Sequence, residues 1–89
     1  MKLQKNLLPL CSTIGEHLRD ARQRRFPGDD QQTFARRLGV SRETLRKMEH
    51  GNPGVALGRY LEAAELLDCL DGFRGLFEPA RDLFEEAGL

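Results

Sequence analysis

Cysteine and histidine are scarce in this sequence, which excludes several kinds of site. The chain has two cysteines, Cys11 and Cys69, and two histidines, His17 and His50, with no Cys-x-x-Cys pair. A disulfide framework needs more cysteines than this. A structural zinc site needs four cysteine or histidine ligands at suitable spacing. We therefore expect neither of these sites, and no bound metal or cofactor.

Long apolar runs and catalytic patterns are missing as well. No stretch of eighteen apolar residues is present, so no transmembrane helix is expected. The apolar stretch near the start is interrupted by Pro9 and is too short for the core of a signal peptide. No glycine-rich phosphate loop and no Ser/His/Asp or Cys/His arrangement is visible. These absences predict a cytoplasmic protein that does not bind membranes and is not an enzyme.

Charge is balanced over the 89 residues but divided along them. Residues 1–50 contain eleven Lys and Arg against six Asp and Glu, whereas residues 51–89 contain three against eight. A polyanion would be attracted to the first half and repelled by the second. The alternative is that the two halves neutralise each other across one domain, which is all that this length allows.

Helical spacing recurs along the chain, and no alternating β-branched run interrupts it, so the sequence predicts an all-α fold. The first helix is expected over STIGEHLRDARQRRF, with Ser12 or Thr13 as its N-cap. Residues 1–11 would then form a flexible N-terminal arm. The inward face of this helix is predicted to contain Ile14, Leu18, Ala21 and Arg22.

Two short helices are expected next. Asp29 or Asp30 would cap a helix over QQTFARRLG, and Gly39 would end it with a positive φ. Ser41 would cap the helix over RETLRKMEH, which Gly51 ends. Because the core needs few side chains from this last helix, its charged residues are left to project outward, as on a recognition helix in the DNA major groove. The residues expected inward are Leu45 and Met48, with Val40 between the two helices.

The remaining sequence predicts a fourth helix and a C-terminal extension. The fourth helix lies in VALGRYLEAAELLDCL, with Leu57, Leu61, Ala64 and Leu66 or Leu67 inward. Residues 71–89 form a helical extension with a sustained apolar stripe, broken at Glu78–Pro79 and followed by a helix over 79–87. The stripe is a predicted dimer interface formed by Phe73, Leu76, Phe77, Leu83 and Phe84. The alternative is that the last helix folds back onto its own core.

From Ile14 to about Leu70 the chain resembles the Cro/repressor-type helix-turn-helix family, also called XRE-like. The likeness rests on IGEHLRDAR, QQTFARRLGVS and RETLRKMEHG, with Phe34-Ala35 where the family has Leu-Ala and a Glu-x-Gly ending at Glu49-His50-Gly51. GNPGVALGRYLEAAELLD also looks like the subgroup of HipB-like antitoxins. The resemblance implies a five-helix lambda-repressor-like DNA-binding domain over 12–70, with its helix-turn-helix unit at about 30–50 and an extra C-terminal helix.

The resemblance also implies roles for individual residues. Residues facing base edges would be Arg42, Glu43, Thr44 and, one turn later, Lys47. Glu43 could accept a hydrogen bond from cytosine, or instead orient Arg42 or Lys47. Phosphate contacts would come from Gln31, which can also brace the recognition helix, and from Arg46. Arg22 and Glu49 would form a partly buried, structural ion pair. Apart from the resemblance, four arginines that flank the helix pair are candidates for phosphate contacts or simply surface charges, namely Arg24, Arg25, Arg36 and Arg37.

These features predict a sequence-specific regulator of transcription that binds double-stranded DNA. The simplest version is a repressor that binds a palindromic operator as a homodimer. One alternative is an antitoxin that binds both DNA and a toxin partner. A third hypothesis is a protein-interaction adaptor that has kept the fold without binding DNA.

Overall fold

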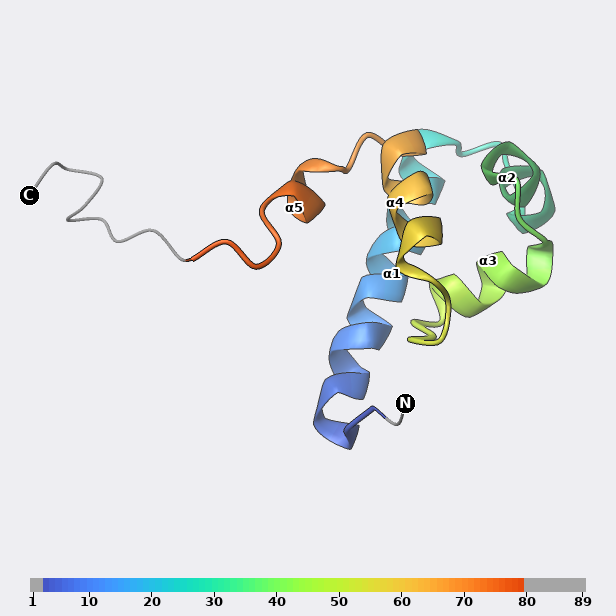
Figure 1. Cartoon of the computed structure of the whole chain (residues 1–89). Helices are drawn as coiled ribbons and strands as arrows, with labels where there is room; N and C mark the ends of the chain where they lie inside the picture. Colours follow the sequence, from blue (N-terminus) through green and yellow to red (C-terminus); the bar gives the residue numbers. More distant parts are fainter. Residues whose placement is uncertain (1–2, 80–89) are drawn as a thin grey trace, which may run out of the picture.

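Five α-helices and one short 3₁₀ helix follow each other in the computed structural model, which describes residues 3–79 (Figure 1). The elements are η1 (Lys5–Leu7), α1 (Leu8–Arg25), α2 (Gln31–Leu38), α3 (Arg42–Glu49), α4 (Leu57–Leu66) and α5 (Asp71–Arg74). No strand occurs in this part of the chain, so the predicted all-α class is confirmed. None of the described helices is both long and apolar enough to cross a lipid bilayer.

The first helix begins earlier than its sequence suggested. α1 starts at Leu8, with Pro9 in its first turn, where the missing N–H group leaves no hydrogen bond unmade. The Thr13 hydroxyl donates to the Pro9 carbonyl at 3.0 Å, so it bonds within the helix instead of capping it. The expected boundary between arm and helix was therefore wrong, because residues 8–11 belong to α1.

The predicted N-cap residues of α2 and α3 are confirmed. The Asp30 carboxylate accepts from the Thr33 amide at 2.8 Å, and this bond keeps the pKa of Asp30 below its ordinary value. The Ser41 hydroxyl accepts from the Thr44 amide at 3.0 Å. Gly39 ends α2 with φ 78°, a conformation that glycine adopts without strain. The turn between the two helices is thus set by local sequence.

The core lies where α2 and α3 pack against α1 and α4. Phe34, Leu45 and Met48 are completely buried, and Val40 packs against their cluster from the turn between α2 and α3. The α4 side of the core includes Ala63. Leu45 and Met48 fix which side of α3 faces inward, so the opposite side is left at the surface.

Two residues expected to face inward lie at the surface. Ile14 is 44% exposed and Leu57 is 57% exposed. The reason for Ile14 is that α1 approaches α3 through Gly15, whose missing side chain lets the backbone at Glu49–Gly51 come close. Because neighbouring positions on a helix differ by about 100°, Ile14 is turned aside from this contact.

The C-terminal helices are shorter than expected. α5 covers only Asp71–Arg74 and ends at Gly75, a residue with low helix propensity. Leu76 and Phe77 follow in a turn, and Phe77 has φ 69°. The prediction of one continuous helical stripe from Phe73 up to Glu78 was therefore wrong. The other two members of the expected interface, Leu83 and Phe84, lie outside the described residues.

Gly51 is the position where a side chain would disturb the fold most. Its φ is 75°, and a Cβ atom there would collide with the Cys11 carbonyl of α1. The amides of Gly51 and Asn52 donate to the carbonyls of Met48 and Lys47, the hydrogen-bond pattern of a Schellman motif. The backbone at this point thus both ends α3 and touches α1.

We expect Gly51→Ala to lower the free energy of unfolding by about 2 kcal/mol or more, since it combines backbone strain with overpacking. Gly58→Ala is the matched control, because no atom lies within 4 Å of its added Cβ and its φ is ordinary. Urea unfolding followed by circular dichroism measures both. Equal stabilities of the two variants would contradict this account of the α1–α3 contact.

Candidate nucleic-acid interface

α3 has one buried side and one charged, exposed side. Positions 42, 43, 46 and 47 lie on the same side of a helix, since residues four apart are neighbours on its surface. All four side chains there, Arg42, Glu43, Arg46 and Lys47, are exposed. Figure 1 shows α2 and α3 together at the opposite end of the molecule from α5. The outward side of α3 therefore presents three cations and one carboxylate at an accessible edge of the fold.

The carboxylate on this side is paired with one of the cations. Arg46 donates from Nη2 to Glu43 Oε1 at 2.7 Å and from Nε to Oε2 at 3.0 Å. These hydrogen bonds hold the pKa of the Glu43 carboxyl below its ordinary value and raise the pKa of Arg46. One of the two roles predicted for Glu43, orienting Arg42 or Lys47, is corrected by the structure, because its ion-pair partner is Arg46. Within the described chain, Arg42 and Lys47 form no ion pair.

Thr44 lies in the first turn of α3 and is bonded to the N-cap residue Ser41. It is half-buried, and its hydroxyl oxygen accepts a hydrogen bond from the Ser41 hydroxyl at 3.0 Å. The side chain thus takes part in the N-terminal cap. A contact to a base would have to come from its methyl group or from the remaining capacity of the hydroxyl.

The expected pair of Arg22 and Glu49 is present and has a third member. Arg22 donates from Nε to Glu49 Oε2 at 2.6 Å and from Nη2 to Oε1 at 3.2 Å, and both residues are buried. Gln31 Nε2 also donates to Glu49 Oε1, at 2.9 Å. One buried carboxylate at the end of α3 is thereby joined to the last turn of α1 and the start of α2. This network fixes the position of α3 relative to both helices.

The two arginines expected on α2 differ in their surroundings. Arg37 donates to the Asp29 carboxylate through Nε at 2.5 Å, and its guanidinium lies 4.5 Å from the centre of the Phe26 ring. The hydrogen bonds to Asp29 raise the pKa of Arg37. Arg36 is exposed. Arg37 is therefore tied to the α1–α2 turn, and Arg36 is the better placed of the two to meet a phosphate.

A polar cleft beside α3 contains residues that the sequence did not single out. It has a volume of about 600 Å³ and is lined by residues from α1, the start of α2 and the end of α3. Arg19 from α1 and His50 from the end of α3 line it together with Gln31. Sequence spacing could not reveal this, because α1 and α3 are brought together only by tertiary packing. Arg19 and His50 thus join Gln31 as candidates for contacts to phosphate.

Comparison with known proteins identifies one family. A family model described as a helix-turn-helix domain matches residues 13–73, which is more than half of the chain. No curated protein and no solved structure gives a significant match. The matched stretch contains all of α2, α3 and α4 and most of α1 and α5. It agrees with the helix-turn-helix part of the expected resemblance, and the finer Cro/repressor-type and HipB-like likenesses stay predictions.

The buried network leads to a stability prediction. We expect Glu49→Ala to lower the free energy of unfolding by about 3–5 kcal/mol, because it leaves the Arg22 charge buried without its partner. Glu62→Ala is the control, since Glu62 is half exposed and pairs with Arg59 on the surface of α4, where ion pairs contribute little. Thermal and urea unfolding at neutral pH would measure the difference. A Glu49→Ala protein as stable as the Glu62→Ala protein would contradict the structural role of the pair.

Proposed function

The chain belongs to the helix-turn-helix domain family, and we propose that it is a sequence-specific regulator of transcription with α3 as its recognition helix. Its target is double-stranded DNA. In its simplest form it is a repressor that binds as a two-fold dimer to a palindromic operator, because two recognition helices related by symmetry read two half-sites.

One observation supports this proposal above the others, namely the division of α3 into a buried and a charged side. Leu45 and Met48 anchor the helix with no exposed surface. Arg42 and Lys47 project from the other side and have no ion-pair partner in the described chain. The major groove is wide enough to admit a helix held in this way.

Base contacts are assigned to the outward side of α3. Arg42, in the first turn, can donate two hydrogen bonds to guanine O6 and N7. Glu43 fixes the Arg46 guanidinium along the helix, so less side-chain entropy is lost when Arg46 reaches the DNA. The same carboxylate repels phosphates, which weakens binding to DNA of any sequence and thereby favours discrimination.

Phosphate contacts are assigned to the surface around the start of α2. Gln31 uses one amide hydrogen on Glu49 and keeps its carbonyl and a second amide hydrogen for other partners. Arg19 lines the polar cleft beside Gln31, together with the Glu16 carboxylate, and Arg36 lies in the last turn of α2. Such contacts would set the orientation of α3 in the groove without reading sequence.

The decisive experiment selects bound duplexes from random DNA and then compares variants on the selected site. We expect Arg42→Ala to weaken binding by about tenfold or more and to relax the preference at one base pair. Arg59→Ala is the control, because Arg59 is a half-exposed arginine on α4 paired with Glu62. Selection of no common sequence, or equal affinities of the two variants, would contradict the proposal. Copurification of a toxin with the chain would favour the antitoxin alternative.

The proposed role of Glu43 has its own test. We expect Glu43→Gln to strengthen binding to unrelated duplex DNA by up to about tenfold at low salt, because one repelled charge is removed. Glu62→Gln is a closely matched control, since Glu62 also pairs with an arginine three residues away. Fluorescence anisotropy over a range of salt concentrations measures both. The Glu43 role would be wrong if neither substitution changed non-specific affinity.

A further inference from the structure

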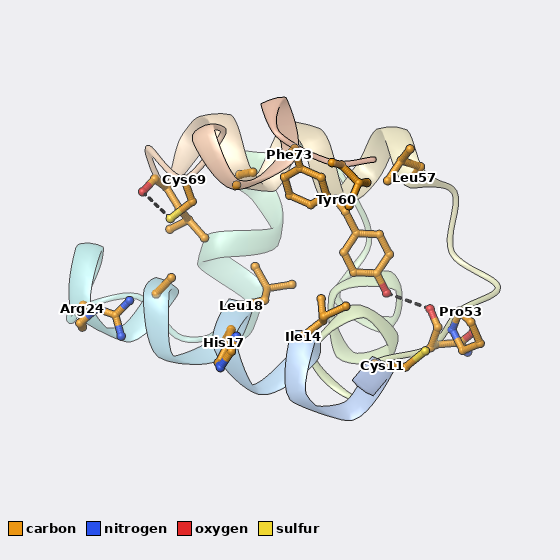
Figure 2. A pocket seen from close by; sticks show the side chains of 17 residues that line it. Cys11, Ile14, His17, Leu18, Arg24, Pro53, Leu57, Tyr60, Cys69 and Phe73 are labelled. Carbon is orange, nitrogen blue, oxygen red and sulfur yellow. Dashed lines mark hydrogen bonds between the residues drawn. The ribbon is translucent and has the colours of Figure 1, made fainter. Parts of the chain in front are cut away.

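An apolar groove lies on the side of α1 that faces α4 and α5. Its volume is about 710 Å³. Figure 2 shows Ile14 and Leu18 of α1 pointing into it from one wall, and Tyr60 and Phe73 from the other. The Tyr60 hydroxyl donates to the Asn52 carbonyl at 2.8 Å, so its polar atom is satisfied within the chain and its ring is left as apolar lining.

The rim of this groove exposes large apolar side chains. Ile14 is 44% exposed, Leu57 is 57% exposed and Leu76 is 52% exposed, and all three line the groove. Leu10 beside it on α1 is 58% exposed. Exposed apolar residues gathered around a groove are typical of a docking surface.

Charged side chains of opposite sign lie at one end of the groove. Of the four arginines of α1, Arg24 lines the groove, whereas Arg19 and Arg22 line the polar cleft on another side of the helix. Arg24 lines the end of the groove near Cys69, as Figure 2 shows. Asp68 and Asp71 flank that end on the opposite wall, next to the lining residues Cys69 and Gly72. In residues 3–79 no ion pair joins the two walls.

We propose that a second copy of this chain docks on the groove, with the two-fold axis running along it. Rotation about that axis places the α1 wall of one copy opposite the α4–α5 wall of the other. Arg24 of each copy then lies near Asp68 and Asp71 of the other copy, and the exposed apolar rims cover each other. The contact is the same from both sides. The inference rests on the two-fold dimer of the proposed function and identifies its surface.

This interface differs from the one expected from sequence. Phe73 and Leu76 belong to it because they line the groove. Phe77 does not line the groove, although it is 97% exposed. α2 and α3 lie at the other end of the molecule from α5, so this contact leaves the proposed DNA surface uncovered (Figure 1).

Sedimentation velocity of the full chain, over a range of concentrations and without DNA, tests the surface. We expect Ile14→Asp or Leu57→Asp to raise the dissociation constant of the dimer by about tenfold or more, since each places a carboxylate in the apolar contact. Phe77→Asp is the matched control and is expected to leave the constant unchanged. Circular dichroism checks that each variant is folded. We expect all three to fold, because the three positions are exposed.

Charge reversal provides a second, independent measurement. Arg24→Glu and Asp71→Arg should each weaken the dimer, because each places like charges across the interface. The double variant should recover most of the loss, since the opposite pairing is restored. No weakening by either single change, or additive weakening in the double variant, would contradict the proposed axis.

Three further outcomes would overturn the inference. The wild-type chain could remain a monomer at every concentration, or Phe77→Asp could disrupt the dimer while Ile14→Asp leaves it intact. A chain shortened after Pro79 could dimerise where the full chain does not, which would assign the groove to residues 80–89 of the same chain.

Binding to a single half-site, measured separately, distinguishes failure of this inference from failure of the proposed function. The Ile14→Asp variant should bind a single half-site with the affinity of the wild type. It should lose only the additional affinity that the wild-type dimer has for the full palindrome. If Ile14→Asp weakens the dimer as expected but the protein binds no duplex, the proposed function is wrong. The assignment of the groove as the dimer interface is then still supported.

Discussion

The buried carboxylate of Glu49 is the interaction on which the arrangement of this molecule depends. It receives hydrogen bonds from Arg22 of α1 and Gln31 of α2, so three helices meet at one charged group. A buried ion needs all its partners, because the interior offers no water to replace them. The geometry of α3 is therefore tied to that of α1 and α2 more tightly than apolar packing alone would require.

Two surfaces follow from that arrangement. With α3 held by Glu49 at its end and by Leu45 and Met48 along its inner side, its charged side is presented at one edge of the fold. The close approach of α1 to α3 at Gly15 and Gly51 turns Ile14 toward the other side, where an apolar groove forms against α4 and α5. The packing of α1 against α3 thus places the two surfaces on different sides of the fold. One is the surface proposed to bind DNA, and the other is the surface proposed to bind a second copy.

Much of the central fold could be predicted because its signals are local. Asp30, Ser41 and Gly39 act within one helical turn, and the spacing of Leu45 and Met48 assigns the inner side of α3. The start of α1 was misplaced because Ser12 and Thr13 resemble caps, although Pro9 can begin a helix as well. Arg37 pairs with Asp29 of the α1–α2 turn, and the exposure of Ile14 follows from the contact between α1 and α3. Helical spacing along the chain encodes neither. The Glu43–Arg46 pair is local, yet several charged neighbours offered equivalent partners.

The central claim is that α3 and the start of α2 are the surface that meets duplex DNA. Backbone amide chemical shifts, recorded while a selected duplex is added to the protein, test it most directly. The account predicts that the largest changes fall on Arg42–Lys47 and around Gln31, with smaller changes at Arg19. Changes confined to the groove between α1 and α4, or no changes with any duplex, would contradict it.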